Sequence, residues 1–496
     1  MKRRKFIHHS IAGATLPFWL QACDSISADS FPIDVQSDYE AGHLIMESAD
    51  WMKRKPIETD VLIVGGGASG VAAAYAHRKQ DYLLVELSNR MGGTAGTVNH
   101  RGTQICQGAH YELAYPDNYG EEVLQLLESL NIIKYESWRK LWTFTDSQHI
   151  IPYQRRQQCF INGEITTDVL PDGAEKMRFL DFLSQYRDKM PLPSRLASEN
   201  ERLLNDITFT QFLSPLNLSP SFIRGLDYHM MDDYGGTCHQ VSAFAGIHYF
   251  MCRPYYQQTV DLFSPPVGNA YFINRMLAQL SPEKIRTHQL VKSIVKSGER
   301  YQAEVLDVNQ KYRYIINANK IVYAGQKHAL KYIFEEESRR FNNDYAPWMV
   351  INIVCPKEEG VYGFWQNEFL GENPSFLGFI DSSVQDTAAP YRIFTAYYCL
   401  KPSDRAYLTT IEENKKRIVD ETIQYITRAL RQSISPLAAY IKIMGHAMAI
   451  PKPGYLFKDA NNQPDAQMTY AGIDNGRLPL LYEALDSGLQ SQGFNR

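Results

Sequence analysis

The chain has 496 residues, of which 44% are hydrophobic and 12% are aromatic, so it is long and apolar enough to bury a large core. Its formal net charge is −4, and a negatively charged protein repels nucleic-acid phosphates, which excludes nucleic acid as an expected partner. The seven cysteines include no Cys-x-x-Cys pair, so the sequence predicts neither a metal site nor a disulfide framework. This composition is typical of a large enzyme rather than of a scaffold protein.

The first 22 residues have the pattern of an export signal. Two adjacent arginines, Arg3 and Arg4, precede an apolar stretch at 11–20 that is too short to span a bilayer. This segment resembles a twin-arginine signal, which implies recognition by the twin-arginine export machinery. Leu20-Gln21-Ala22-Cys23 resembles a bacterial lipobox, so we expect lipidation of Cys23 and a periplasmic protein held at the membrane by a lipid anchor. A plain signal peptide cut near Ala22 and an uncleaved N-terminus are the alternatives.

The next segment, 23–55, is polar and contains few β-branched residues. Such a composition buries too little apolar surface to fold by itself. We therefore expect a tether between the membrane anchor and a fold that begins near Ile57.

A glycine motif within residues 60–96 is the most informative feature of the chain. Gly65, Gly67 and Gly70 follow an apolar run and open an alanine-rich segment, which is the context that a dinucleotide-binding Gly-x-Gly-x-x-Gly fingerprint requires. Gly65 permits the tight turn, Gly67 lets the backbone approach a pyrophosphate, and Gly70 lets the helix pack on the strand. The N-terminus of the helix attracts the phosphates. The cofactor-binding residues predicted in this motif are Gly65, Gly67, Ala68, Ser69 and Gly70.

Glu86 supports the same interpretation. It ends the second predicted strand about 20 residues beyond the first glycine, where a carboxylate accepts the two ribose hydroxyl groups of a dinucleotide. The same carboxylate would repel a 2′-phosphate. The alternative is a glycine-rich turn in an unrelated α/β sheet.

The segment after Glu86 indicates which dinucleotide binds. Arg90-Met91-Gly92-Gly93 resembles the Arg-x-Gly-Gly segment of the flavoprotein superfamily that contains the amine oxidases and phytoene desaturases. In that superfamily the arginine and the glycines lie along the diphosphate and the flavin, which implies that FAD is the cofactor. The resemblance adds four cofactor-binding residues, which are Arg90, Gly92, Gly93 and Thr94.

The resemblance continues toward the C-terminus. Residues 266–271 resemble the segment that leads back to the cofactor domain, and Val291 lies where the family makes a backbone contact to adenine. The closing segments 470–474 and 483–488 resemble the pattern Ala-Gly-x-Glu followed by Gly-Ala-x-x-Ser-Gly. This implies that Gly472 and Asp474 approach the ribityl chain, and that the helix around Ser487 points toward the isoalloxazine ring.

The resemblance implies an α/β fold in which a Rossmann-like FAD-binding domain is interleaved with an α+β substrate domain. We expect the FAD-binding domain to comprise 56–120, 262–332 and 451–496, and the substrate domain to comprise 121–261 and 333–450. The flavin should lie in the cleft between the domains, because ligands of open α/β sheets bind at the carboxyl ends of the strands.

The segment 232–250 contains acidic, aromatic and histidine residues. Packing against the core is the default interpretation for such a segment. Lining of a substrate pocket is the alternative.

Candidate catalytic residues lie in 445–455, where amine oxidases carry a tryptophan and then a Gly-Gly-Cys-Tyr segment. By this resemblance Tyr455 would face the flavin, and the absence of the cysteine implies that FAD is held noncovalently. His446 is a candidate acid or base because the unperturbed pKa of histidine is near neutrality, with a hydrogen-bonded core histidine as the alternative. The second tyrosine of the amine-oxidase aromatic cage falls near Leu480, so such a cage would lack one wall.

These observations predict an exported FAD-dependent oxidoreductase that oxidises a C–N or C–C bond of a small molecule by hydride transfer to the flavin. One alternative is a desaturase or isomerase that acts on an apolar, membrane-derived molecule. Another is a flavin-bearing lipoprotein that binds or assembles a partner. The electron acceptor that reoxidises the flavin, whether oxygen, a quinone or a partner protein, stays open.

Overall fold

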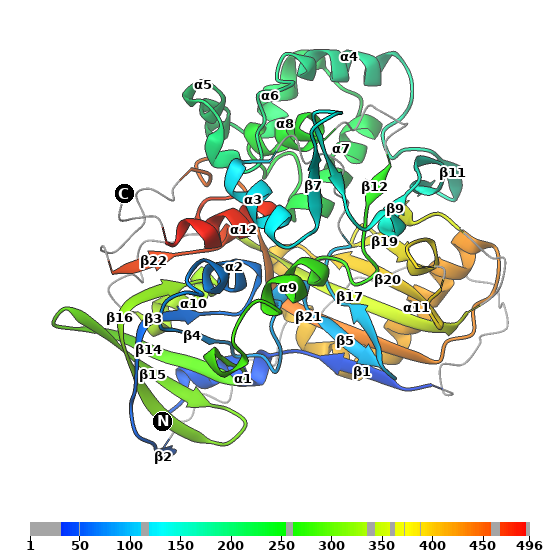
Figure 1. Cartoon of the computed structure of the whole chain (residues 1–496). Helices are drawn as coiled ribbons and strands as arrows, with labels where there is room; N and C mark the ends of the chain where they lie inside the picture. Colours follow the sequence, from blue (N-terminus) through cyan, green and yellow to red (C-terminus); the bar gives the residue numbers. More distant parts are fainter. Residues whose placement is uncertain are drawn as a thin grey trace, which may run out of the picture.

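The computed structural model describes residues 31–48, 50–110, 119–253, 261–334, 343–357, 363–371, 373–386, 388–457 and 467–492. These residues form two units that are interleaved along the chain, each built on a sheet of its own (Figure 1). Residues 1–30, which include the predicted export signal and Cys23, lie outside the described residues.

The first unit, which we call the Rossmann unit, contains a sheet with the order β13-β4-β3-β16-β15-β14, and β2 and β22 also pair with β16. Strands β13, β4, β3 and β22 run parallel to their neighbours, whereas β14, β15 and β16 form an antiparallel meander. The strands are β2 (Met52–Lys53), β3 (Ile57–Val64), β4 (Tyr82–Val85), β13 (Ile285–Arg286), β14 (Gln289–Ser297), β15 (Arg300–Asp307), β16 (Tyr312–Tyr323) and β22 (Met468–Tyr470).

Strand β3 explains why helices cover both faces of this sheet. Its side chains alternate between faces, so Ile63 belongs to the apolar cluster that contains α2 and α12, and Leu62 belongs to the cluster that contains α10. A parallel strand that is buried on both faces needs a continuous apolar run, which 61–64 supply. The helices of the unit are α2 (Ala68–Ala76), α9 (Ala270–Leu277), α10 (Lys327–Ile333) and α12 (Leu481–Gln490).

The second unit contains a sheet with the order β1-β21-β17-β20-β19-β18-β10-β11. Helix α11 (Ile411–Leu430) covers one face, where Ile418 and Ile426 pack with Ile351 and Ile441 of the sheet. The strands are β1 (Ile33–Gln36), β10 (Gln157–Ile161), β11 (Glu164–Thr166), β17 (Tyr345–Pro356), β18 (Gln366–Leu370), β19 (Phe376–Asp381), β20 (Tyr391–Cys399) and β21 (Ala438–Ala449).

Most of the remaining elements gather at the top of Figure 1, above the two sheets. They share one large apolar cluster with α2 and α12, so the core is continuous between the units. These elements and the small hairpins are β5 (Thr97–His100), β6 (Thr103–Cys106), α3 (Glu121–Ser129), β7 (Ile133–Glu136), β8 (Leu141–Phe144), β9 (Ile150–Ile151), α4 (Ala174–Ser184), α5 (Glu199–Arg202), α6 (Phe209–Leu213), α7 (Pro220–Tyr234), α8 (Ala243–Cys252) and β12 (Leu262–Phe263).

The described part of the predicted tether is folded, so the expectation of a tether is wrong for 31–53. It forms β1, helix α1 (Tyr39–His43), the short 3-10 helix η2 (Leu44–Met46) and β2. The physical reason is a short alternation, because Ile33 and Val35 pack on the core of the second unit while Asp34 between them is exposed. Because the alternation involves only four residues, the composition of the segment as a whole remains polar.

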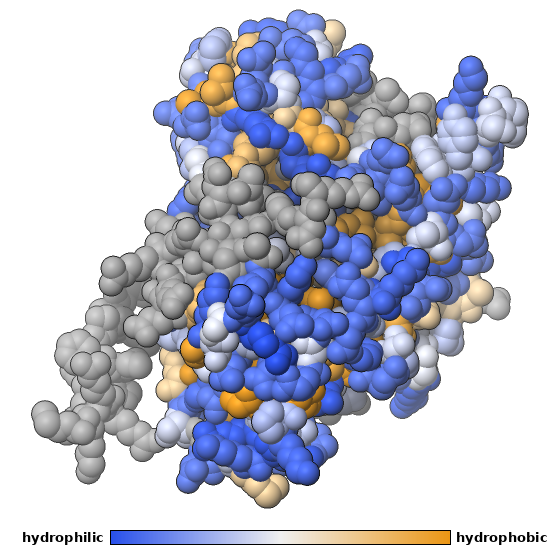
Figure 2. Space-filling model, turned by 60° about the vertical axis from the view of Figure 1, so that its left-hand side comes forward, coloured by the Kyte–Doolittle hydropathy of each residue, from blue (hydrophilic) through white to orange (hydrophobic). Residues whose placement is uncertain are grey.

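The surface drawn in Figure 2 is mostly hydrophilic, and its hydrophobic residues occur in small groups. Within the described residues, every helix is too short or too polar to cross a bilayer. The six cysteines in those residues are buried and form no disulfide bond with one another. None of the described His, Cys, Asp and Glu residues cluster in a group of three or more that could hold a metal ion.

Candidate functional site: a cavity shared by the two units

A cavity of about 1540 Å³ is lined by residues of both units. Most of the predicted cofactor residues line it, whereas Gly70, Gly92 and Ser487 lie behind its wall. Those that line it are Gly65, Gly67, Ala68, Ser69, Glu86, Arg90, Gly93, Thr94, Val291, Gly472 and Asp474. The far end of the cavity is formed by the second unit.

The glycine turn between β3 and α2 combines one open position with two crowded ones. Gly65 has a φ of +102°, and a Cβ added there would lie 2.9 Å from the backbone of Ala324. A Cβ at Gly70 would lie 1.8 Å from the carbonyl oxygen of Gly65. At Gly67, the N-cap of α2, an added Cβ would meet only the Cα of Gly93, at 4.0 Å. The turn therefore has no room for side chains at Gly65 and Gly70, where a Cβ would meet protein backbone, but has free space at Gly67, which faces the cavity.

Glu86 is held at the end of β4 by two backbone N–H groups. Its carboxylate oxygens accept hydrogen bonds from the N–H of Gly66 at 2.5 Å and from the N–H of Ser88 at 2.8 Å. Burial raises the pKa of the Glu86 carboxyl, while these two hydrogen bonds act in the opposite direction. The carboxylate thus has a fixed orientation at the wall of the cavity.

The second glycine segment lies beside the first. The N–H of Gly92 donates to the carbonyl oxygen of Gly66 at 2.8 Å, and a Cβ at Gly93 would lie 3.1 Å from the Cα of Gly67. Arg90 donates from Nη2 to the side-chain oxygens of Gln107 and, at 2.9 Å, of Gln36. Burial lowers the pKa of Arg90. The two segments together form a wall of backbone, with the guanidinium of Arg90 beside it.

The C-terminal motif closes the cavity from the other side of α2. The N–H of Gly472 donates to Oγ of the buried Ser487 at 2.9 Å, which joins the loop after β22 to α12. Asp474 accepts hydrogen bonds from the N–H of Lys327 at 2.9 Å and from the hydroxyl of Tyr345 at 2.7 Å. Burial raises the pKa of the Asp474 carboxyl. Asp474 therefore ties the loop after β22 to the first residue of α10 and to β17.

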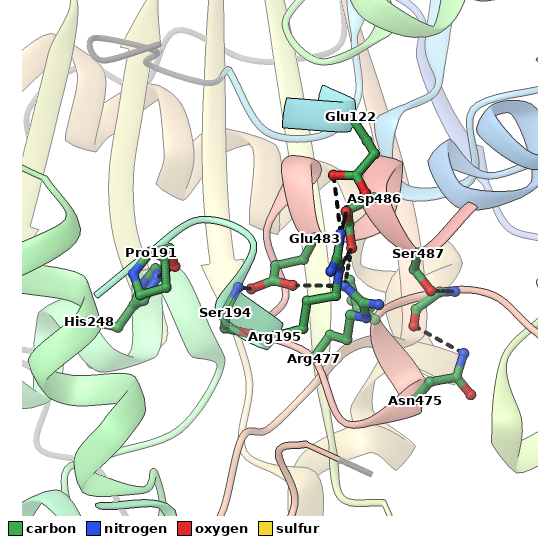
Figure 3. Close-up of polar contacts among 12 residues, drawn as sticks. Glu122, Pro191, Ser194, Arg195, His248, Asn475, Arg477, Glu483, Asp486 and Ser487 are labelled. Carbon is green, nitrogen blue, oxygen red and sulfur yellow. Dashed lines mark hydrogen bonds and ion pairs between the residues drawn. The ribbon is translucent and has the colours of Figure 1, made fainter. Parts of the chain in front are cut away.

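Helix α12 is anchored by a buried network of charges, drawn in Figure 3, that sequence reasoning missed. Arg477 contacts Asp486 at 2.6 Å and Glu483 at 3.5 Å. From the loop before α5, Arg195 donates to both oxygens of Asp486 at 2.8 and 3.0 Å, and the N–H of Ser194 donates to Glu483 at 2.6 Å. The available signal was the spacing of two carboxylates three residues apart in an otherwise apolar helix.

His446 lines the cavity and stacks on His328, which sequence reasoning did not single out. The two ring centroids are 3.7 Å apart, and Tyr345 packs edge-on against both rings. Burial lowers the pKa of His446 to about 4, and the positive charges of Arg405 and Lys331 act in the same direction. Burial and the neighbouring His446 lower the pKa of His328 to about 3. Both imidazoles are therefore neutral at pH 7.

Tyr455 lies elsewhere. Its side chain is only 2% exposed, and it does not line the cavity. Its hydroxyl donates to the carbonyl oxygen of Ile473 at 2.6 Å, so it supports the loop that carries Gly472 and Asp474. The structure therefore brings His446 to the cavity but not Tyr455.

The face of the second sheet that is turned away from α11 forms the far end of the cavity. Val350 of β17 and Tyr397 of β20 are partners in the sheet and both line the cavity, as does Trp348. Met349 and Ile351, which alternate with them, pack toward α11. Successive side chains of these strands therefore point in turn to the core beneath α11 and to the far end of the cavity. We call this end of the cavity the chamber.

Carboxylates accompany the aromatic residues in this chamber. Glu368 is 4% exposed and accepts hydrogen bonds from Sγ of Cys159 at 2.7 Å and from Nε2 of Gln366 at 3.2 Å. Asp232 also lines the chamber, and the negative charges of Glu368 and Asp232 add to burial in raising the pKa of Tyr228. Asp233 forms an ion pair with Arg253 at 2.6 Å.

The alternatives for 232–250 thus divide along the segment. Asp232 and Asp233, near the end of α7, line the chamber. The residues of α8 are buried in the core, where Nε2 of His248 lies 3.0 Å from the carbonyl oxygen of Pro191. The default interpretation, packing against the core, therefore holds for α8. The alternative, lining of a pocket, holds for Asp232 and Asp233.

Comparison with known proteins bears on the fold. The sequence family described as an NAD(P)-binding Rossmann-like domain matches residues 63–130. No curated protein matches the sequence. Among solved structures, wild-type putrescine oxidase bound to putrescine has a TM-score of 0.63 at 14% identity, over 89% of this chain and 99% of that one.

Two further structures match over a similar extent. Cyclohexylamine oxidase from Brevibacterium oxydans IH-35A has a TM-score of 0.62 at 16% identity, over 88% of this chain and 98% of that one. The CLA-producing fatty acid isomerase from P. acnes has a TM-score of 0.62 at 14% identity, over 87% of this chain and 97% of that one. The predicted fold class is confirmed: the chain has the two-domain α/β fold of these proteins, with a Rossmann-like unit at its core.

Proposed function

We propose that the protein is an FAD-dependent oxidoreductase that oxidises a C–N bond of a small cationic molecule. The observation that carries the proposal is the continuity of the cavity, which joins a dinucleotide-binding turn to a chamber with aromatic walls and carboxylates. A flavin that reached from the turn into this chamber would meet a substrate held there.

The residues present fit FAD. The open face of Gly67 leaves room for a diphosphate, and the carboxylate of Glu86 has the position and orientation to accept ribose hydroxyl groups. Arg90 supplies a positive charge beside the two glycine segments. Cysteine is absent from the described residues that line the cavity, which supports a noncovalently held flavin.

Bound FAD would supply the hydride acceptor. The chain itself would orient the substrate and exclude water with Trp348, Tyr397 and Tyr228. His446 and His328, being neutral at pH 7, add no positive charge to the cavity. His446 stays our candidate base because a neutral imidazole can accept a proton, although its lowered pKa makes it a weaker base than an ordinary histidine.

The charge of the chamber favours a cationic substrate. Glu368 and Asp232 place negative charge beside aromatic rings, and an ammonium group is stabilised by both. A second candidate is a desaturase or isomerase of an apolar substrate, which the apolar wall formed by Leu377, Phe379 and Ile380 favours. The two candidates differ in the substrate that reduces the flavin.

Anaerobic titration of the flavin spectrum tests the proposal. We expect amines to bleach the flavin band and polyenes or unsaturated fatty acids to leave it unchanged. Glu368→Gln should weaken amine binding about tenfold, because the amide removes the negative charge while keeping the shape of the side chain. Bleaching by unsaturated apolar molecules alone would transfer the proposal to the second candidate. No bleaching by either class, together with a stable protein partner, would favour a binding role.

We also propose export by the twin-arginine route and a lipid anchor at Cys23, supported by the sequence of the first 23 residues. Cys23→Ala should move the protein from the membrane fraction to the soluble fraction of the periplasm. Replacement of Arg3 and Arg4 by lysine should keep it in the cytoplasm. A Cys23→Ala protein that stayed with the membrane would contradict the anchor.

A further inference from the structure

Residues 33–46 cross from the second unit to the Rossmann unit (Figure 1). At one end, β1 pairs in parallel with β21, with Ile33 opposite Ala439 and Gln36 opposite Lys442. At the other end, Ile45 packs into the apolar cluster beneath the Rossmann sheet. The segment is therefore held at both ends, by hydrogen bonds in one unit and by apolar packing in the other.

Between these ends the segment bonds to residues at the predicted cofactor site. Asp38 accepts hydrogen bonds from Oγ of Ser88 at 3.2 Å and from Nζ of the buried Lys442 at 3.2 Å. Ser88 is the residue whose N–H orients Glu86, and Gln36 accepts the hydrogen bond from Arg90 described above. The segment thus braces the carboxylate and the guanidinium that we assign to the cofactor.

The same segment lines the cavity. Val35, Asp38, Tyr39, Gly42, His43 and Met46 line it together with Glu86 and Val291. Tyr39 is 57% exposed and Met46 is 55% exposed, so large apolar surfaces remain uncovered at this wall. The ring of Tyr39 packs edge-on against that of His43, with centroids 3.9 Å apart. Lys442 offsets the charge of Asp38, and the exposed ring of Tyr39 offers a face on which an aromatic ligand can pack.

We propose that residues 33–46 form a strap that completes the site for the adenosine half of the dinucleotide. The position of Glu86 in the Rossmann unit assigns the ribose, and hence the adenosine, to this end of the cavity. Tyr39 and His43 contact the adenosine, and Asp38 is a positioning residue that acts through Ser88 and Lys442. This inference rests on the proposed function, because it requires that the cavity binds FAD.

The test uses the full-length protein in detergent, with the variants Tyr39→Ala and Asp38→Ala. The matched control is Glu47→Ala, because the exposed side chain of Glu47 does not line the cavity. We expect both strap variants to raise the rate of FAD dissociation, followed by flavin fluorescence, about fivefold, and the control to change it less than twofold. ADP binding to the FAD-depleted protein, measured by calorimetry, should weaken to the same extent, because the strap contacts the adenosine half.

A second measurement does not depend on the variants. Hydrogen–deuterium exchange of residues 33–46 in the wild-type protein should slow when ADP is added to the FAD-depleted form. Two results would overturn the strap alone. One is unchanged exchange of residues 33–46 on addition of ADP. The other is that the strap variants bind ADP as the wild type does while Glu86→Gln binds it more weakly. A wild-type protein that bound neither FAD nor ADP would overturn the proposed function and the strap with it.

Discussion

Gly67 is the residue at which the fold leaves room for a ligand instead of a side chain. Its neighbours Gly65 and Gly70 are glycines because a Cβ would collide with the backbone. Substitutions at these two positions would therefore test the stability of the turn. At Gly67 an added Cβ meets no protein atom closer than 4.0 Å. We expect a larger side chain there to extend into the cavity rather than into the turn.

We therefore predict that Gly67→Val leaves the protein folded but reduces bound FAD to less than about a tenth, because the side chain blocks the approach of the pyrophosphate. Flavin content per protein and the thermal midpoint of the FAD-depleted form measure the two effects. Gly371→Val is the control, since an added Cβ there meets no atom within 4 Å. A Gly67→Val protein that purified with full flavin content would contradict the assignment.

The stacked histidines give a prediction about pH. Burial depresses the pKa of His446 to about 4 and that of His328 to about 3, whereas the unfolded chain binds these protons near pH 6.5. Between these values the unfolded state binds more protons than the folded state, so stability rises with pH. The contribution of the pair is fully present above pH 6.5 and is lost as the pH falls toward 4 and 3.

We expect the double variant His328→Gln and His446→Gln to lose less stability than the wild type when the pH is lowered from 7 to 5. Urea unfolding at the two pH values measures the difference. Glu86, Asp474 and Glu483 have raised pKa values and act in the opposite direction, but they are common to both proteins. Equal losses in the two proteins would show that the histidines are not held neutral.

At the scale of elements, α12 is the part of the site that depends on distant residues. Its carboxylates Glu483 and Asp486 are fully buried, and the charges that balance them come from Arg477 just before the helix and from Arg195 of the helical region above the sheets (Figure 3). Leu481 and Ala484 on the same helix line the cavity. The network therefore sets the position of one cavity wall.

Removing one cation should destabilise this arrangement strongly, because it leaves buried carboxylates without full compensation. We predict that Arg477→Met lowers the free energy of unfolding by about 3 kcal/mol. Arg417→Met should lower it by less than about 1 kcal/mol, since the ion pair of Arg417 with Glu421 on α11 is exposed. Urea unfolding of both variants measures the contrast, and similar losses would refute a structural role for the network.

Strap and turn also differ in how far the sequence predicted them. The turn could be predicted because its glycines, helix and acid are contiguous and each has a local conformational cause. Strand β1 could not, because four alternating residues in a polar segment gain their stability only by pairing with β21. Local composition therefore predicted a tether for residues that form one wall of the cavity.

For the whole molecule, the fold class could be predicted because each segment that carries the resemblance, from the glycine turn at 65–70 to the closing segments at 470–488, is short and can be recognised locally. The chamber could not be assembled in advance, since Trp348, Glu368 and Tyr397 come from separate strands that meet only through the order of the second sheet. Asp232 joins them from helix α7. His328 was missed for the same reason, as its partner lies in a distant strand. Tyr455 is the opposite case. The resemblance predicts that it faces the flavin, but in the structure its side chain does not line the cavity.

The proposed function requires that the cavity between the units holds FAD. We would test this by recording the visible spectrum of the purified protein, followed by acid precipitation and chromatography of the supernatant. We predict a flavin spectrum and release of about one FAD per chain into the supernatant, as expected for a noncovalent flavoprotein with one such site. A colourless protein that bound only NAD, or no dinucleotide at all, would contradict the proposed function.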